Sequence, residues 1–135
     1  MDPVKIKANG QVLAYVFPRT LGAPEGIRFL NDASDPLQVG LMERPAGHHV
    51  QPHMHPPCER KTHMTPEFFF VQSGRVCVTI YDKKWKEIAR HELQSGDGML
   101  ILDGGHEVEI LEATRMFEVK LGPYLGDENA KVFRT

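Results

Sequence analysis

The chain has 135 residues, a formal net charge of −2 and 41% hydrophobic residues. This length suits one domain with its own core, so residues 1–135 are expected to form a single domain. The near-neutral charge gives no positive surface for nucleic acid or for an anionic membrane. No apolar run approaches the roughly eighteen residues of a membrane-spanning helix. The N-terminus lacks the apolar core of a signal peptide, which leads us to expect a cytoplasmic protein whose two cysteines, Cys58 and Cys77, are reduced.

Short apolar and β-branched runs alternate with turn residues along the chain, and no run has a convincing helical period. Turns are predicted at Ser73-Gly74, at Asp82-Lys83-Lys84 and at Asp103-Gly104-Gly105. The predicted strands cover residues 11–17, 27–30, 37–42, 50–55, 67–72, 75–81, 87–93, 99–102, 107–111 and 115–121. This spacing predicts an all-β antiparallel sandwich or barrel, a class that includes the double-sheet jelly roll. Residues 1–36 would add N-terminal strands, and residues 122–135 a C-terminal tail.

Five of the seven histidines lie within residues 48–63. His53 and His55 are two residues apart, so their side chains would share one face of a strand. Glu67 opens a following strand, and His106 opens a later one. Two inward imidazoles would cost desolvation free energy without a partner, whereas three imidazoles and a carboxylate suit a divalent transition metal. The predicted metal ligands are therefore His53, His55, Glu67 and His106.

These residues belong to a longer pattern that resembles the paired motifs of the cupins. The residues that carry the likeness are Gly47, His53, His55, Glu67 and Gly74 for the first motif, and Gly96-Asp97 and Gly104-Gly105-His106 for the second. The gap of eleven residues between His55 and Glu67 is longer than is usual in the family. The second motif is one residue short, and Leu102 stands where a proline is common. The likeness covers roughly residues 37–121 and implies a double-stranded β-helix, or jelly-roll barrel, with a metal site.

The donor set limits the choice of ion. Three imidazoles and one carboxylate are too rich in nitrogen for Mg²⁺ or Ca²⁺ and lack the thiolates of a structural zinc site. Mn²⁺, Fe²⁺, Ni²⁺ or Zn²⁺ would fit. His63 and Glu59 are alternative ligands, because each lies four residues from one of the predicted ligands.

The loop 56–66 is polar, and loops on a rigid scaffold commonly carry recognition. Glu59, Arg60 and His63 are therefore predicted to contact a small-molecule ligand, with Arg60 offering a planar fork to a carboxylate or phosphate. A flap that only excludes bulk water is the alternative. Tyr81 is a further candidate for substrate binding.

Two classes of function fit such a site. The first is a small metalloenzyme: an isomerase, epimerase or lyase acting on a sugar-like or hydroxy-keto molecule, or an Fe²⁺ dioxygenase. Short stand-alone cupins often occur with carbohydrate-related genes, which favours sugars by association. The second class is a non-catalytic, metal-dependent sensor or carrier. An acid or base beyond the ligands would separate them, but Glu118 alternates with Phe117 and Val119 and is expected to face solvent.

Alternation also predicts an assembly. Glu67 and Phe69 would share one face of a strand, which places Phe68 and Phe70 on the other face. Two exposed phenyl rings need a cover, supplied either by the N-terminal strands or by a second subunit. Because closed two-fold dimers are the commonest assembly, a homodimer is predicted.

Overall fold

The computed structural model describes all residues, 1–135, and nearly all of its regular structure is β. The elements are β1 (Val4–Ala8), β2 (Gln11–Phe17), β3 (Ile27–Phe29), β4 (Gly40–Met42), β5 (Glu67–Tyr81), β6 (Glu87–Gln94), β7 (Gly98–Ile101), β8 (Gly105–Lys120) and the single-turn helix α1 (Asp127–Ala130). The all-β prediction is confirmed. The helical part of the chain offers no segment long and apolar enough to cross a membrane.

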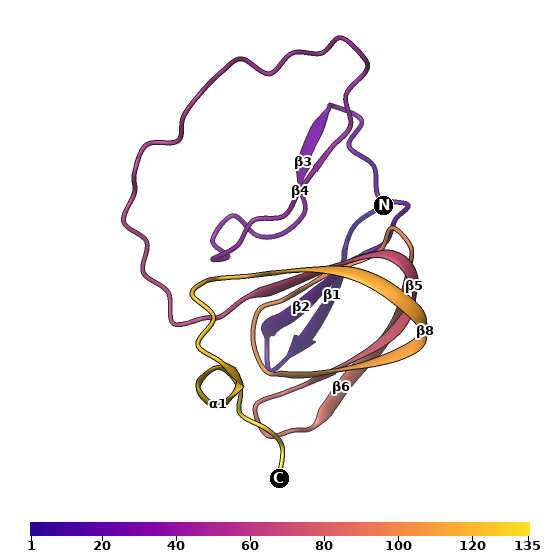
Figure 1. Ribbon diagram of the computed structural model, residues 1–135, viewed down its shortest axis with the longest axis vertical. Coiled ribbons are helices and arrows are strands. Elements are labelled where there is room, and N and C mark those ends of the chain that lie inside the picture. The colour runs from indigo at the N-terminus through magenta and orange to yellow at the C-terminus, as the bar shows by residue number, and fades with distance from the viewer.

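Six strands form one antiparallel sheet built around β5. One edge of β5 pairs with β8 along most of both strands. On the other edge, the first residues of β5 pair with β7 and its last residues pair with β6; β7 in turn pairs with β2, and β2 with β1. Figure 1 shows β5 and β8 as long ribbons that bend together, so that the sheet curls into an open half-barrel. Strands β3 and β4 pair separately as a small two-stranded sheet.

The predicted hairpin turn at Ser73-Gly74 is wrong, because β5 continues through it. The β5–β8 register shifts repeatedly between Val71 and Val76, which is the signature of β-bulges. Gly74 has a φ of 93°, and a Cβ there would collide with the Ala113 carbonyl of β8. Glycine therefore allows the two long strands to bend together at this point. For the same reason the predicted strands 107–111 and 115–121 form one strand, β8.

Two apolar clusters lie on opposite faces of the sheet. The concave face buries a core that includes Val76, Val78 and Ile80 of β5. The outer face packs Phe68 against Phe17, Leu21 and neighbouring apolar residues from the N-terminal part of the same chain. Of the two phenyl rings that were expected to need a cover, one is therefore covered within the chain, while Phe70 remains 38% exposed.

Residues 44–66, which we call the arm, contain no strand. The predicted strand 50–55 does not form, and the predicted strand 37–42 is reduced to β4. At its root the arm is tied to the β3–β4 region, where Glu43 N–H donates to the Gly26 carbonyl at 2.9 Å. Within the arm the only backbone–backbone hydrogen bond runs from His48 N–H to the Pro45 carbonyl, at 3.2 Å. Figure 1 shows the arm as a wide loop that runs from β4, apart from the half-barrel, to the start of β5.

Candidate metal centre

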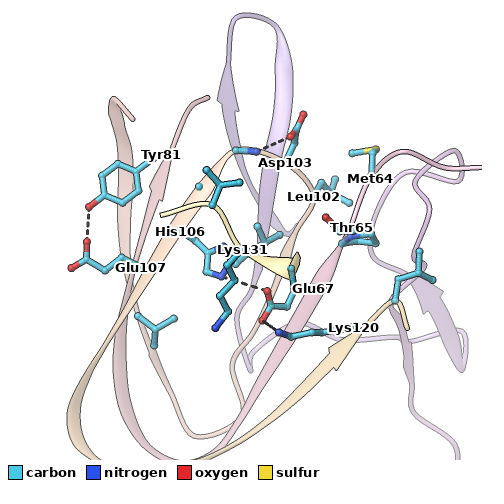
Figure 2. Close-up of a pocket in the computed structure, with 18 of the residues that line it drawn as sticks. Met64, Thr65, Glu67, Tyr81, Leu102, Asp103, His106, Glu107, Lys120 and Lys131 are labelled. Carbon is cyan, nitrogen blue, oxygen red and sulfur yellow. Dashed lines mark hydrogen bonds and ion pairs between the residues drawn. The ribbon is translucent and has the colours of Figure 1, made fainter. Parts of the chain in front are cut away.

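A cavity of about 1260 Å³ lies between one end of the half-barrel and the C-terminal tail. Because β8 is long and curved, residues near both of its ends reach this cavity, among them His106 and Glu118. Glu67 enters it from the start of β5. Figure 2 shows Glu67, His106 and Lys120 gathered at its centre, with Lys131 of the tail close to them.

Glu67 and His106, which we call the barrel pair, lie with Oε2 and Nε2 3.4 Å apart. They are not partners in the β5–β8 register, because Glu67 is opposite Lys120 and His106 is opposite Ile80. The curl of the sheet brings them together. Glu67 is mostly buried, with 14% of its side chain exposed, whereas 31% of the His106 side chain remains exposed.

A second carboxyl group and an ammonium group complete the surroundings of Glu67. Glu118 forms a hydrogen bond with Glu67, and Lys120 Nζ lies 3.1 Å from Glu118 Oε1 and 3.9 Å from Glu67 Oε1. Burial, followed by the hydrogen bond and charge of Glu118, raises the pKa of Glu67 to about 8. The same hydrogen bond lowers the pKa of Glu118, and burial lowers the pKa of His106. At neutral pH the close contact thus joins a neutral imidazole to a protonated carboxyl group, although its geometry is that of an ion pair.

His53 and His55, which we call the arm pair, lie together in the arm with ring centroids 5.2 Å apart. The Nδ1 atom of His53 is 2.7 Å from the Gln51 carbonyl oxygen. Both side chains are exposed. The structure thus brings the four predicted ligands together as two pairs but does not join the pairs. No group of three or more His, Cys, Asp or Glu side chains is assembled in the arrangement of a metal site.

The geometry of the barrel pair fits a transition ion. Two donors of one tetrahedral ion, at the usual zinc–ligand distances, lie roughly 3.4 Å apart. This is the separation between His106 Nε2 and Glu67 Oε2. A neutral imidazole is a donor that such ions prefer, and so is a carboxylate, which Glu67 would become by losing its proton to solvent on binding. The barrel pair would provide two donors, and the arm pair contains two imidazoles of the same kind.

The residues predicted to bind a ligand divide between the cavity and the surface. His63 and Tyr81 line the cavity. The Tyr81 hydroxyl donates to Glu107 Oε2 at 2.6 Å, and this hydrogen bond raises the pKa of Tyr81. Glu59 and Arg60 are exposed in the arm and do not line the cavity, and Glu59 lies 4.0 Å from Lys61.

Sequence reasoning missed two residues that line the cavity, Glu118 and Lys120. Glu118 was expected to face solvent, and 42% of its side chain is exposed, but it also lines the cavity beside Glu67. Lys120 was not predicted. The sequence does carry a signal for both, because Met116, Glu118 and Lys120 alternate regularly along β8. This alternation predicts that Glu118 and Lys120 line the cavity only if the more apolar alternate set, Phe117 and Val119, is placed on the outer face.

Comparison with protein-family models, with curated proteins and with solved structures finds nothing that matches this chain. The likeness to the cupins therefore rests on the motif residues themselves.

Proposed function

We propose that this chain is a metal-binding protein of the cupin type with a jelly-roll barrel, which holds one divalent transition ion with Glu67, His106, His53 and His55. The observation that carries the proposal is the barrel pair. Glu67 and His106 come from different motifs of the sequence, yet their donor atoms lie 3.4 Å apart at the centre of the main cavity. The exposed arm pair would supply the remaining two imidazoles.

The function that this site supports best is a proton-transfer enzyme, an isomerase, epimerase or lyase, for a small hydroxy-keto or sugar-like molecule. A divalent ion would act as a Lewis acid on a carbonyl oxygen of that molecule. Glu118 provides the base, because it is an ionised carboxylate directly beside Glu67. Lys120 holds that carboxylate in place at 3.1 Å, and Tyr81, which keeps its proton, offers a hydroxyl group on the same cavity.

In this mechanism Glu118 removes a proton from the hydroxyl-bearing carbon next to the carbonyl group and returns it to the former carbonyl carbon, while the proton of the substrate hydroxyl group moves to the former carbonyl oxygen, which gives isomerisation. Epimerisation would in addition need a second acid that protonates the first carbon from its opposite face. A positioned carboxylate of this kind typically contributes about 10²–10⁴-fold to the rate. The presence of this base beside the predicted ligands favours an enzyme over a sensor or carrier.

Metal analysis of purified protein tests the proposal. Wild-type protein prepared without added metal should carry close to one transition ion per chain, because four ligands hold the ion. His106→Ala, and separately the double change His53→Ala with His55→Ala, should each lower that content at least about tenfold. His91→Ala is the matched control, since this histidine lies in β6 and does not line the cavity. Full occupancy in either ligand variant would contradict the assignment.

A further inference from the structure

Strand β8 has one open edge along its whole length. It pairs only with β5, so the backbone N–H and C=O groups of its other edge have no strand partner from Gly105 to Lys120. Proteins normally shorten, cover or charge such edges, because an open edge is a template for another strand. An edge of 16 residues is long for a strand left unpaired.

The outer face beside this edge is apolar. Phe117 and Val119 of β8 are 51% and 49% exposed, and Phe117 lies directly opposite the exposed Phe70 of β5. Neighbouring exposed phenyl rings of this kind mark a surface that another protein surface covers. One added strand would form hydrogen bonds with the open edge but would leave much of this apolar face exposed to solvent. A second copy of the half-barrel could cover both.

The arm carries a net positive charge, whereas β8 carries a net negative charge. Arg44, Arg60 and Lys61 against Glu59 give the arm a net charge of 3 − 1 = +2. In β8 the acidic residues Glu107, Glu109, Glu112 and Glu118 against the basic residues Arg115 and Lys120 give 2 − 4 = −2. The two segments are therefore electrostatically complementary. This complementarity favours their association and disfavours association of β8 with segments of like charge.

The sequence of the arm also suits an added edge strand. Proline lacks an N–H group, so it is tolerated where that position faces away from the sheet. If Pro52 points its backbone outward, His53 and His55 direct their backbone groups toward β8 and share one side-chain face. Beside the start of β8, that face places both imidazoles next to His106. Met54, on the opposite face, is 94% exposed in the arm and has no cover within its own chain.

We propose that two copies of this chain exchange arms, each arm adding a strand to the open edge of β8 in the other copy. His53 and His55 of one copy would then complete the metal site begun by Glu67 and His106 of the other. The shared metal site rests on the proposed metal function. The exchange of arms itself is inferred from the open edge of β8 and from the apolar outer face. A second copy is favoured over the chain's own arm because the arm runs apart from its own half-barrel (Figure 1) and because an arm alone would not bury Phe70, Phe117 and Val119.

Subunit complementation with Zn²⁺ alone tests the exchange. The arm variant carries His53→Ala and His55→Ala, and the barrel variant carries Glu67→Gln and His106→Ala. Neither should retain Zn²⁺ by itself. When the two are unfolded and refolded together, about half of the dimers are mixed and each mixed dimer has one intact site, so about one quarter of the wild-type Zn²⁺ content should return. The control mixture contains the arm variant and a chain with all four substitutions in place of the barrel variant. This control mixture should recover no Zn²⁺ binding.

Recovery of about one quarter supports the exchange, and no recovery in a mixture whose wild-type parent binds Zn²⁺ overturns it, because each arm then serves its own barrel. If wild-type protein binds no Zn²⁺, the metal function fails, and sedimentation decides the exchange separately. Wild-type protein should sediment as a dimer at concentrations on the order of tens of micromolar. A variant whose residues 47–55 are replaced by a Gly-Ser segment of equal length should dissociate. A monomeric wild type, or a Gly-Ser variant as dimeric as wild type, would overturn the exchange.

Discussion

The carboxyl groups of Glu67 and Glu118 share a hydrogen bond between β5 and β8. The residues are close because Glu118 lies opposite Phe69 in the register, within two residues of Glu67 along the same bent ladder. Burial favours the protonated form of Glu67, and the ionised Glu118 accepts its hydrogen bond. A divalent ion bound by Glu67 would have to displace this proton, which would leave Glu118 as the neighbouring carboxylate without a predicted ligand role.

Glu118→Gln should therefore separate catalysis from metal binding. The amide keeps the size of the side chain but cannot accept a proton from carbon, so exchange of carbon-bound hydrogen should slow by about 10²–10⁴-fold. The measurement is nuclear magnetic resonance of a panel of hydroxy-ketones and aldoses incubated with the protein in D₂O, alongside metal analysis. Glu109→Gln is the control, because Glu109 is exposed on the same strand and does not line the cavity. Unchanged exchange in Glu118→Gln would remove this residue as the base, and absence of exchange in wild type would favour a non-catalytic binder.

The bend at Gly74 predicts a second, purely structural effect. Gly74→Ala forces a side chain into a left-handed backbone conformation and into the Ala113 carbonyl, so the free energy of unfolding should fall by about 2–4 kcal/mol. Gly10→Ala separates the two causes, since Gly10 has a φ of 75° but has no atom within 4 Å of an added Cβ. It should cost only about 1 kcal/mol. Urea unfolding measures both values, and equal losses would show that the collision is absent.

How far the sequence predicts this fold depends on the strand. Strand β2 was predicted with its observed bounds, and β6 and β7 within about a residue, because their apolar alternation is flanked by clear turn residues. The long strands β5 and β8 were predicted as four short ones, because Ser73-Gly74 has turn chemistry but forms a bulge. A local pattern cannot distinguish the two, since the difference lies in pairing with residues far along the chain.

The residues of the candidate site were likewise predicted only in part. The motif spacing identified Glu67 and His106, which the structure brings together, and the i, i+2 spacing of His53 and His55 matches their neighbouring rings. The strand predicted for residues 50–55 is absent because nothing in this single chain pairs with it. Glu118 is 42% exposed, as expected, but its place in the cavity was missed because Phe117 and Val119, the more apolar alternate set, point outward. An outward apolar set is the pattern expected when the cover comes from another molecule.

Asp103 predicts a dependence of stability on pH. Partial burial opposes its ionisation, but the Gly104 N–H, Lys83 and Gln11 together hold the pKa of this carboxyl group below its usual value. Because the pKa is lower in the folded state, the carboxylate stabilises the fold above the unfolded-state pKa of about 4, and this stabilisation is lost as pH falls through the folded-state pKa.

Asp103→Asn should accordingly lower the free energy of unfolding by about 1 kcal/mol at pH 7, and the difference from wild type should shrink below about pH 4. Urea unfolding at several pH values measures it. Asp2→Asn is the comparison, because Asp2 forms an exposed ion pair with Arg28 at 2.8 Å and should contribute less than about 0.5 kcal/mol at any pH. A difference for Asp103→Asn that stays constant down to pH 3 would contradict the assigned cause.

Limited proteolysis tests whether metal binding fixes the arm. Trypsin should cut first after Arg60 or Lys61, because both lie in the exposed arm without strand pairing; Arg44 is protected by the proline that follows it. If His53 and His55 bind the same Zn²⁺ ion as Glu67 and His106, the arm is held against the barrel, and adding Zn²⁺ should slow this cleavage at least about tenfold. In His106→Ala the barrel pair is broken, so Zn²⁺ should have little effect, while His91→Ala should behave as wild type. Equal cleavage rates with and without Zn²⁺ in wild-type protein would show that the arm pair and the barrel pair do not share an ion.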